Sequence, residues 1–174
     1  SAKELLISMN ENQMCFQDKD SGVTVVSRLI EGEYPDYKAV INPILLNPNK
    51  LTLKTADLMS SLRRVAVMSN AKVRSTTLTV DIDGFDGKLS MVSQSAEVGE
   101  ATDWMGVEGY EIPNKEDGSD TKVAFALNAD YLLSMLGAIS TEMITLRHRD
   151  ALSPILLQES DNTNTTYVCM PMRL

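Results

Sequence analysis

Two stretches of the sequence share one order of secondary-structure elements. A strand predicted at 51–53 leads into a helix predicted over 56–69, and three strands follow it. A strand predicted at 122–127 leads into a second helix over 129–139, and three further strands follow that one. Antiparallel strands with one helix in each unit indicate an α+β fold, with both helices on one face of the sheets. The sequence therefore predicts a βαβββ unit repeated twice, alike in form but not in residue identity.

The two predicted helices carry start signals and apolar stripes. Thr55 and Asn128 are residue types that cap helix N-termini, and each directly precedes one of the helices. Apolar residues then recur largely at the three- or four-residue spacing of an amphipathic helix. They are Leu58, Leu62, Val65 and Met68 in the first helix and Leu132, Leu133, Leu136 and Ile139 in the second.

The residues before the repeat predict three more strands. These are expected at 4–9, 13–17 and 23–29, joined by turns rich in Asn, Asp and Gly. The segment 42–49 contains two prolines and three asparagines, which is typical of a linker or a domain boundary. Because the chain has no initiator Met and enters a strand almost at once, we expect it to be a piece of a longer protein.

Charge and cysteine content narrow the class of protein. Sixteen Lys and Arg against 24 Asp and Glu give a net charge of -8, which argues against attraction of the whole surface to nucleic acid or to a membrane. No apolar run approaches the roughly 20 residues that span a bilayer. We expect a cytoplasmic protein in which Cys15 and Cys169 are reduced core thiols.

No catalytic constellation stands out in the sequence. Glycine-rich phosphate loops, nucleophile elbows and CxxC metal motifs are all absent from it. The single histidine, His148, follows a predicted strand beside two arginines, where we expect a solvated side chain. Asp81, Asp83 and Asp86 fit a hairpin turn better than a calcium loop. We therefore predict no enzyme, no catalytic residue, no metal and no cofactor.

Two charged regions leave alternatives open. The acids of 97–120 are typical of a solvated edge, but a metal-dependent hydrolase using Glu108 or Glu111 is a third reading of the chain. A small group of cations is either a complement to the helix dipole or a weak contact with a nucleic-acid backbone. These cations are Arg63, Arg64, Lys72 and Arg74.

The C-terminal segment 167–174 is unusually apolar for the end of a chain. A predicted strand runs into an end stiffened by Pro171, with Met170 and Met172 on either side of it. Such a surface suits a groove for a partner peptide, because Met adapts to varied side chains. The other reading is an end that packs back on the core, and composition favours neither.

Five segments resemble, in order and spacing, the bacterial DNA polymerase III β subunit, the sliding clamp. They are SRLIEGEYPDY at 27–37, LRRVAVMSN at 62–70, LNADYLL at 127–133, DALSPILL at 150–157 and YVCMPMRL at 167–174. The resemblance implies a DNA-clamp (processivity) fold, with the last strands of the second clamp domain in 1–41 and the complete third domain in 42–174.

The same resemblance implies a function. In this family, three such domains per subunit close head to tail into a homodimeric ring, with helices toward duplex DNA and sheets outward. The ring binds DNA without sequence specificity and confers processivity by tethering polymerase, clamp-loader and repair proteins through short peptides. The alternative is an unrelated α+β peptide-binding module that never encircles DNA.

The resemblance also assigns roles to residues. The DNA-facing set is the group of Arg63, Arg64, Lys72 and Arg74, and the subunit interface uses Val67 and Met68. Because the family's pocket draws part of its wall from the rest of the second domain, we expect weak peptide binding, with a dissociation constant of roughly 0.1–1 mM. The partner-peptide pocket falls on Pro35, Val40, Asn128, Tyr131, Pro154, Val168, Met170, Pro171, Met172, Arg173 and Leu174.

Overall fold

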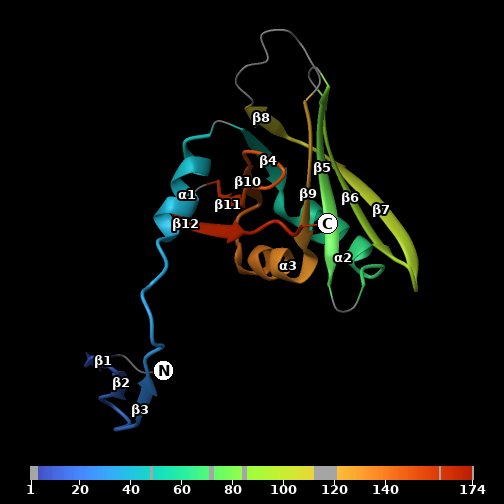
Figure 1. Ribbon diagram of the computed structural model, residues 1–174. Helices are drawn as coiled ribbons and strands as arrows, with labels where there is room; N and C mark the ends of the chain where they lie inside the picture. Colours follow the sequence, from blue (N-terminus) through green and yellow to red (C-terminus); the bar gives the residue numbers. More distant parts are fainter. Residues whose placement is uncertain are drawn as a thin grey trace. The chain divides into compact units, whose positions relative to one another are not determined.

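The computed structural model describes residues 4–47, 49–70, 73–83, 86–111, 121–160 and 162–173 (Figure 1). The chain divides into two compact units, Ser1–Asp36 and Tyr37–Leu174. This division falls five residues before the boundary expected after residue 41.

The smaller unit is a single antiparallel sheet of three strands. Its strands, β1 (Leu5–Met9), β2 (Gln13–Asp18) and β3 (Thr24–Arg28), pair in the order β1-β2-β3 and confirm the three predicted strands. Asn10 and Asp18 build the two turns, because their amide or carboxyl oxygens accept backbone N–H groups two or three residues on. Cys15 is only half-buried in this sheet, so the expectation of a core thiol is wrong for it.

The larger unit contains both copies of the predicted βαβββ repeat. Its elements are α1 (Tyr37–Leu45), β4 (Lys50–Lys54), α2 (Thr55–Ala66), β5 (Ser75–Asp83), β6 (Asp86–Ser95), β7 (Gly99–Gly106), β8 (Gly109–Glu111), β9 (Thr121–Asn128), α3 (Ala129–Ala138), β10 (Met143–Arg147), β11 (Ile155–Glu159) and β12 (Asn162–Cys169). The first repeat runs from β4 to β7 and the second from β9 to β12. The short strand β8 is an addition between them.

Helix α1 corrects the prediction of a linker over 42–49. The helix continues to Leu45 even though Pro43, inside it, cannot donate a backbone hydrogen bond. Ile44 is fully buried, so apolar burial outweighs the cost of the proline.

Each repeat gives its first strand to the other repeat's sheet. The five-stranded sheet has the order β12-β11-β10-β4-β8, so β4 of the first repeat pairs with β10 of the second. The four-stranded sheet has the order β7-β6-β5-β9, so β9 of the second repeat pairs with β5 of the first. Neither repeat can therefore complete its sheet without the other.

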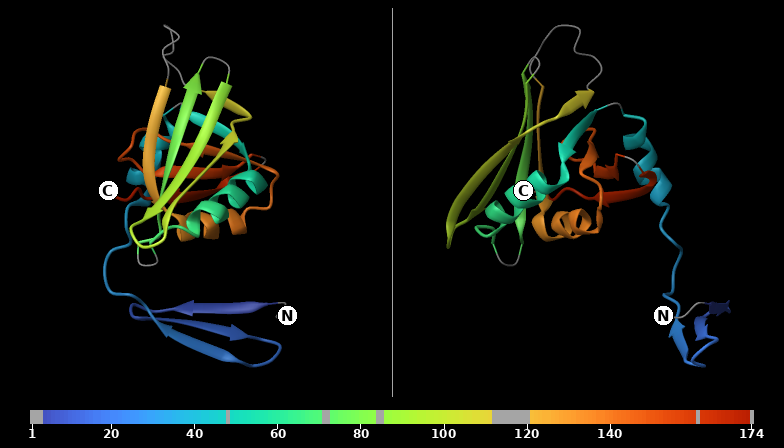
Figure 2. Two further views of the ribbon diagram at one scale, coloured as in Figure 1. Left: turned by 90° about the vertical axis from the view of Figure 1, so that its right-hand side faces the viewer. Right: turned by 180° about the vertical axis from the view of Figure 1, so that it is seen from behind.

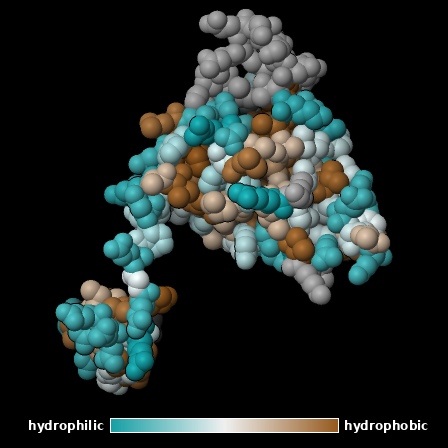
Figure 3. Space-filling view, in the orientation of Figure 1, coloured by the Kyte–Doolittle hydropathy of each residue, from teal (hydrophilic) through white to brown (hydrophobic). Residues whose placement is uncertain are grey.

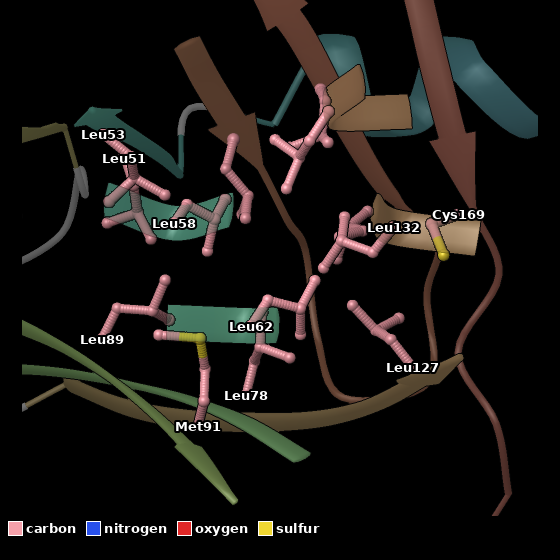
Figure 4. Close-up of a cluster of buried hydrophobic side chains, with 14 of the residues drawn as sticks. Leu51, Leu53, Leu58, Leu62, Leu78, Leu89, Met91, Leu127, Leu132 and Cys169 are labelled. Carbon is pink, nitrogen blue, oxygen red and sulfur yellow. The ribbon is translucent and has the colours of Figure 1, made fainter. Parts of the chain in front are cut away.

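The two helices α2 and α3 pack side by side against the sheets and share one core (Figure 2). Figure 4 shows Leu58 and Leu62 of α2 facing Leu89 and Met91 of β6, while Leu132 extends the same cluster from α3. Cys169 is part of this cluster, as predicted, and burial raises the pKa of its thiol. The α+β class and the placement of both helices on one face are confirmed.

The helix ends differ from the prediction in two places. Asn128 caps α3 as predicted, since its Oδ1 accepts from the backbone N–H groups of Asp130 and Tyr131. Thr55 does not cap α2: it lies inside the helix, and its Oγ1 donates to the carbonyl of Thr141 at 2.8 Å. Helix α2 also ends at Ala66, three residues earlier than predicted.

His148 is buried, which corrects the expectation of a solvated side chain. It has no exposed surface, and its ring lies 5.9 Å from that of Phe125, centroid to centroid. Neither ring nitrogen has a hydrogen-bond partner among the described residues. Burial lowers the pKa of His148 below its ordinary value of 6.5, although the nearby Asp150 opposes this shift.

Candidate partner-peptide site

The last residues of the chain lie against β9 and build two neighbouring pockets. After β12 ends at Cys169, the chain continues without regular structure toward β9 (Figure 1). The backbone N–H of Met172 donates to the carbonyl of Ala126 in β9 at 2.7 Å, which holds this segment in place. Figure 3 shows apolar side chains gathered on the face of the larger unit that carries this end of the chain.

Met170, Pro171 and Met172 line both pockets, so the C-terminal segment forms a wall that the pockets share. The first pocket has a volume of about 620 Å³ and is also lined by Val73, Asn128, Tyr131, Met135, Val168 and Cys169. The second has a volume of about 590 Å³ and is also lined by Ala124, Ala126, Ala151, Leu152 and Arg173. Both are large enough for apolar side chains of a short peptide.

Asn128 both lines the first pocket and caps helix α3. Its Oδ1 is occupied by the helix cap, and its Nδ2 donates to the carbonyl of Val73 at 3.4 Å. The residue therefore holds the start of α3 and has little hydrogen-bonding capacity left for a ligand. Tyr131, in the first turn of α3, is 66% exposed and also lines the first pocket.

A turn organised by Asp150 forms the outer wall of the second pocket. Its Oδ1 accepts from the N–H groups of Leu152 and Ser153, and its Oδ2 accepts from the Ser153 hydroxyl. The Ser153 hydroxyl, followed by the backbone donors, lowers the pKa of Asp150. The turn presents Leu152, which is 77% exposed, beside the groove.

Most of the predicted pocket residues come together here. Asn128, Tyr131, Val168 and the segment 170–173 line one pocket or both. Pro154, half-buried just before β11, and Val40, on α1, line neither pocket. Pro35 belongs to the smaller unit, and Leu174 lies outside the described residues.

The sequence reasoning missed several lining residues. These are Val73, Ala124, Ala126, Met135, Ala151, Leu152 and Cys169. The alternation of Ala124 and Ala126 in β9 was an available signal, because two small residues on one face of a strand leave room for a ligand.

The predicted DNA-facing cations are partly engaged in ion pairs. Arg64 contacts Asp103 at 2.6 Å, and Arg74 binds Asp130 through two nitrogens at 2.9 Å. The Arg74 pair lowers the pKa of Asp130. Arg63 is exposed on α2, and Lys72 lies outside the described residues.

The predicted subunit-interface residues follow α2. Val67 is 71% exposed and Met68 is half-buried, and both lie in the turn after the helix rather than within it.

The acids considered for hydrolysis are paired with lysines of β4. Glu108 lies 3.0 Å from Lys54, and Glu111 lies 2.7 Å from Lys50. The described residues contain no group of three or more His, Cys, Asp or Glu arranged to hold a metal. Residues 112–120, which include the predicted acidic loop, lie outside the described ranges. Within those ranges, no helix combines the length and the apolar character needed to cross a bilayer.

The duplicated βαβββ architecture, with two helices against antiparallel sheets, defines a domain of the DNA-clamp class. Residues 47–173 match the model of the family described as DNA polymerase III beta subunit, C-terminal domain. The chain belongs to this family, which decides against an unrelated peptide-binding module.

Known relatives and solved structures agree with this assignment. The beta sliding clamp of Pseudomonas putida is 34% identical over 152 residues, which cover 87% of this chain and 37% of that protein. A sliding clamp from Bartonella birtlesii, bound to griselimycin, has a TM-score of 0.79 at 28% identity over 98% of this chain and 41% of its own. A Pseudomonas aeruginosa clamp with ligand gives 0.78 at 29% identity, covering 98% and 42%. The chain thus spans about two fifths of the length of these relatives.

Proposed function

We propose that this chain supplies the partner-peptide docking site of a replicative sliding clamp. The observation that carries the proposal is the pair of pockets on either side of Met170–Met172, in a chain of the clamp family. Short peptides from polymerase, clamp-loader and repair proteins dock there. The complete protein is a homodimeric ring around duplex DNA in the cytoplasm, and it holds its partners on DNA without catalysis.

The chemistry of the pockets suits a short apolar peptide. Methionine and proline walls accept Leu and Phe side chains by apolar burial, which contributes about 25 cal/mol per Å² removed from water. Tyr131 lines the first pocket, where its hydroxyl can donate or accept a hydrogen bond, and Arg173 lines the second, where its guanidinium can donate to peptide carbonyls. Affinity then comes from two or three anchoring side chains rather than from a large interface.

The proposal for DNA rests on topology rather than on strong contacts. Two of the assigned cations already have carboxylate partners, which leaves little charge for phosphate contacts. A closed ring needs few such contacts, because it retains DNA by encircling it. The exposed Val67 beside Met68 is the apolar surface that we assign to the subunit interface.

A peptide-binding measurement with matched variants tests the docking site. A fluorescently labelled peptide of the Gln-Leu-x-Leu-Phe type is titrated with the protein, and its anisotropy is followed. We expect a dissociation constant of roughly 0.1–1 mM and about a tenfold loss in Leu152→Ala, which corresponds to about 1.4 kcal/mol.

Leu46→Ala is the matched control, because Leu46 is similarly exposed but lies just after α1. Equal weakening by both variants, or no binding at several millimolar, contradicts the proposal.

A further inference from the structure

An exposed tryptophan shares the outer face of the four-stranded sheet with the second pocket. Trp104 of β7 is 61% exposed and is the only tryptophan of the chain. The Nζ of Lys88 lies over its ring, 4.9 Å from the centroid, in a cation–π contact. Trp104 thus contributes little to the core, and its large apolar surface is unexplained by the fold.

The strand register connects Trp104 directly to the second pocket. Trp104 is paired with Ser90, Ser90 with Thr79, and Thr79 with Ala124, which lines that pocket. Directly paired residues lie on the same face of a sheet, so these four side chains form one row across it, here called the outer row. Figure 2 (left) shows the four strands β9, β5, β6 and β7 side by side in this order.

The outer row has the dimensions of a short extended peptide. Three steps between strands, each about 4.8 Å, separate Ala124 from Trp104 by roughly 14 Å. An extended chain advances about 3.3 Å per residue and covers this distance in four to five residues. Thr79 and Ser90, the two middle residues of the outer row, have small side chains, so a peptide can lie close to the sheet there.

The charges beside the outer row differ in sign from those of the chain as a whole. Lys88 lies on the ring of Trp104, Lys122 neighbours Ala124 on the same face of β9, and Arg173 lines the second pocket. Asp81 lies between the two lysines, since it is paired with Lys88 in the strand register and lies 3.6 Å from Lys122. Glu100 lies on the same face of β7 as Trp104, four residues before it. A chain with a net charge of -8 therefore presents cations along this path, which favours an acidic ligand.

We propose that the outer row binds the flanking residues of the same partner peptide that fills the pockets. This inference rests on the proposed function, and it names the partner's chemistry beyond the apolar core. The flank carries Asp or Glu for Lys88 and Lys122, and one aromatic or large apolar side chain that packs on Trp104. Its continuity with the second pocket makes a peptide extension the occupant that fits this face.

The unique tryptophan makes the test direct. Three labelled peptides without tryptophan are titrated: Gln-Leu-Ser-Leu-Phe, and the same core with Gly-Glu-Glu-Gly-Phe added at one end or the other. Their affinities for the parent protein and for each variant are measured by anisotropy, and Trp104 emission is recorded in parallel where the tryptophan is present. We expect one extended peptide to bind about five- to tenfold more tightly than the core and to shift the emission to shorter wavelength. Trp104→Ala abolishes that gain but binds the core peptide as the parent does.

Charge controls separate the contribution of the cations. Lys88→Gln reduces the gain, whereas Lys54→Gln, on the other sheet, leaves it unchanged. Extensions with Lys in place of Glu bind no more tightly than the core. The inference is overturned if neither acidic extension improves binding, if the gain persists in Trp104→Ala, or if dilution of the protein alone shifts the emission, which indicates that a second copy covers Trp104. Failure of the core peptide to bind overturns the proposed function and this extension with it.

Discussion

The two repeats have the same order of elements but carry different surfaces. Helix α2 of the first repeat bears Arg63 and Arg64 in its last turn, whereas α3 of the second contains no Lys or Arg. The start of α2 has no side-chain cap, while α3 is capped by Asn128, which also lines the first pocket. The comparison shows that a shared apolar core fixes the architecture and leaves each repeat's surface free for its own task.

The largest effect expected concerns the dependence of the repeats on one another. Leu62 of α2 and Leu132 of α3 are fully buried in one cluster. Because each repeat also completes the other's sheet, Leu62→Ala and Leu132→Ala should each destabilise the whole larger unit by about 2–5 kcal/mol. Denaturant unfolding followed by circular dichroism measures this, and by NMR both repeats should unfold together. A variant that unfolds only its own repeat contradicts the shared core.

A second prediction concerns the buried His148 of the second repeat. Its pKa is lowered in the folded state, so near and below pH 6.5 the unfolded state binds more protons than the folded state. The stability of the protein therefore decreases as the pH is lowered through this range. His148→Leu removes two buried nitrogens without partners among the described residues and should raise stability by about 1–3 kcal/mol.

Unfolding experiments at several pH values between about 5 and 8 test the sign of this effect. The parent protein should lose stability toward the acidic end by more than His148→Leu does. An equal slope in both proteins would show that other groups, such as Asp150, account for the dependence.

The two helix starts give a smaller, paired effect. Asn128→Ala removes the cap of α3 and should cost about 1 kcal/mol of stability. Thr55→Ala removes the bond to the Thr141 carbonyl and should cost a similar amount, about 0.5–1.5 kcal/mol. Only Asn128→Ala should also weaken peptide binding, because only Asn128 lines the first pocket. Equal peptide affinity in both variants would contradict a contribution of Asn128 to peptide binding and leave it the role of a helix cap alone.

The smallest effects are expected at the two ion pairs. Asp103→Asn and Asp130→Asn should each lower stability by about 0.2–1 kcal/mol, with the larger loss at Asp103, which is less exposed. Burial opposes the shift at Asp103, but hydrogen bonds from Trp104 and Arg64 outweigh it and lower the pKa of this carboxyl. Both carboxylates therefore stabilise the fold above their unfolded pKa values, and this contribution is lost as pH falls through the folded ones. Thermal unfolding at low and high salt measures it, since salt screens exposed pairs.

Local patterns were sufficient to predict most of the elements and part of the site. Apolar spacing predicted α2 and α3, and turn residues predicted the β5–β6 hairpin, in which Asp83 pairs with Asp86. The apolar residues at the end of the chain indicated a groove by their type alone. These features depend on residues close to one another in the sequence.

What could not be predicted depends on contacts between distant residues. Helix α1 forms because Ile44 is buried in the folded unit, which outweighs the proline signal. Arg64 pairs with Asp103, and Arg74 with Asp130, only once the sheets and helices have assembled. The second pocket needs β9, the Asp150 turn and the C-terminal segment together, so Leu152 had no local signature as a lining residue.

The central claim is that the pockets beside Met170–Met172 are the docking site. A protein-observed NMR titration with a Gln-Leu-x-Leu-Phe peptide tests it most directly, because it maps millimolar binding residue by residue. The account predicts saturable shifts centred on residues 168–173, Tyr131 and Leu152, with little change in β1, β2 and β3. Shifts that are absent at several millimolar, or that saturate elsewhere in the chain, would contradict it.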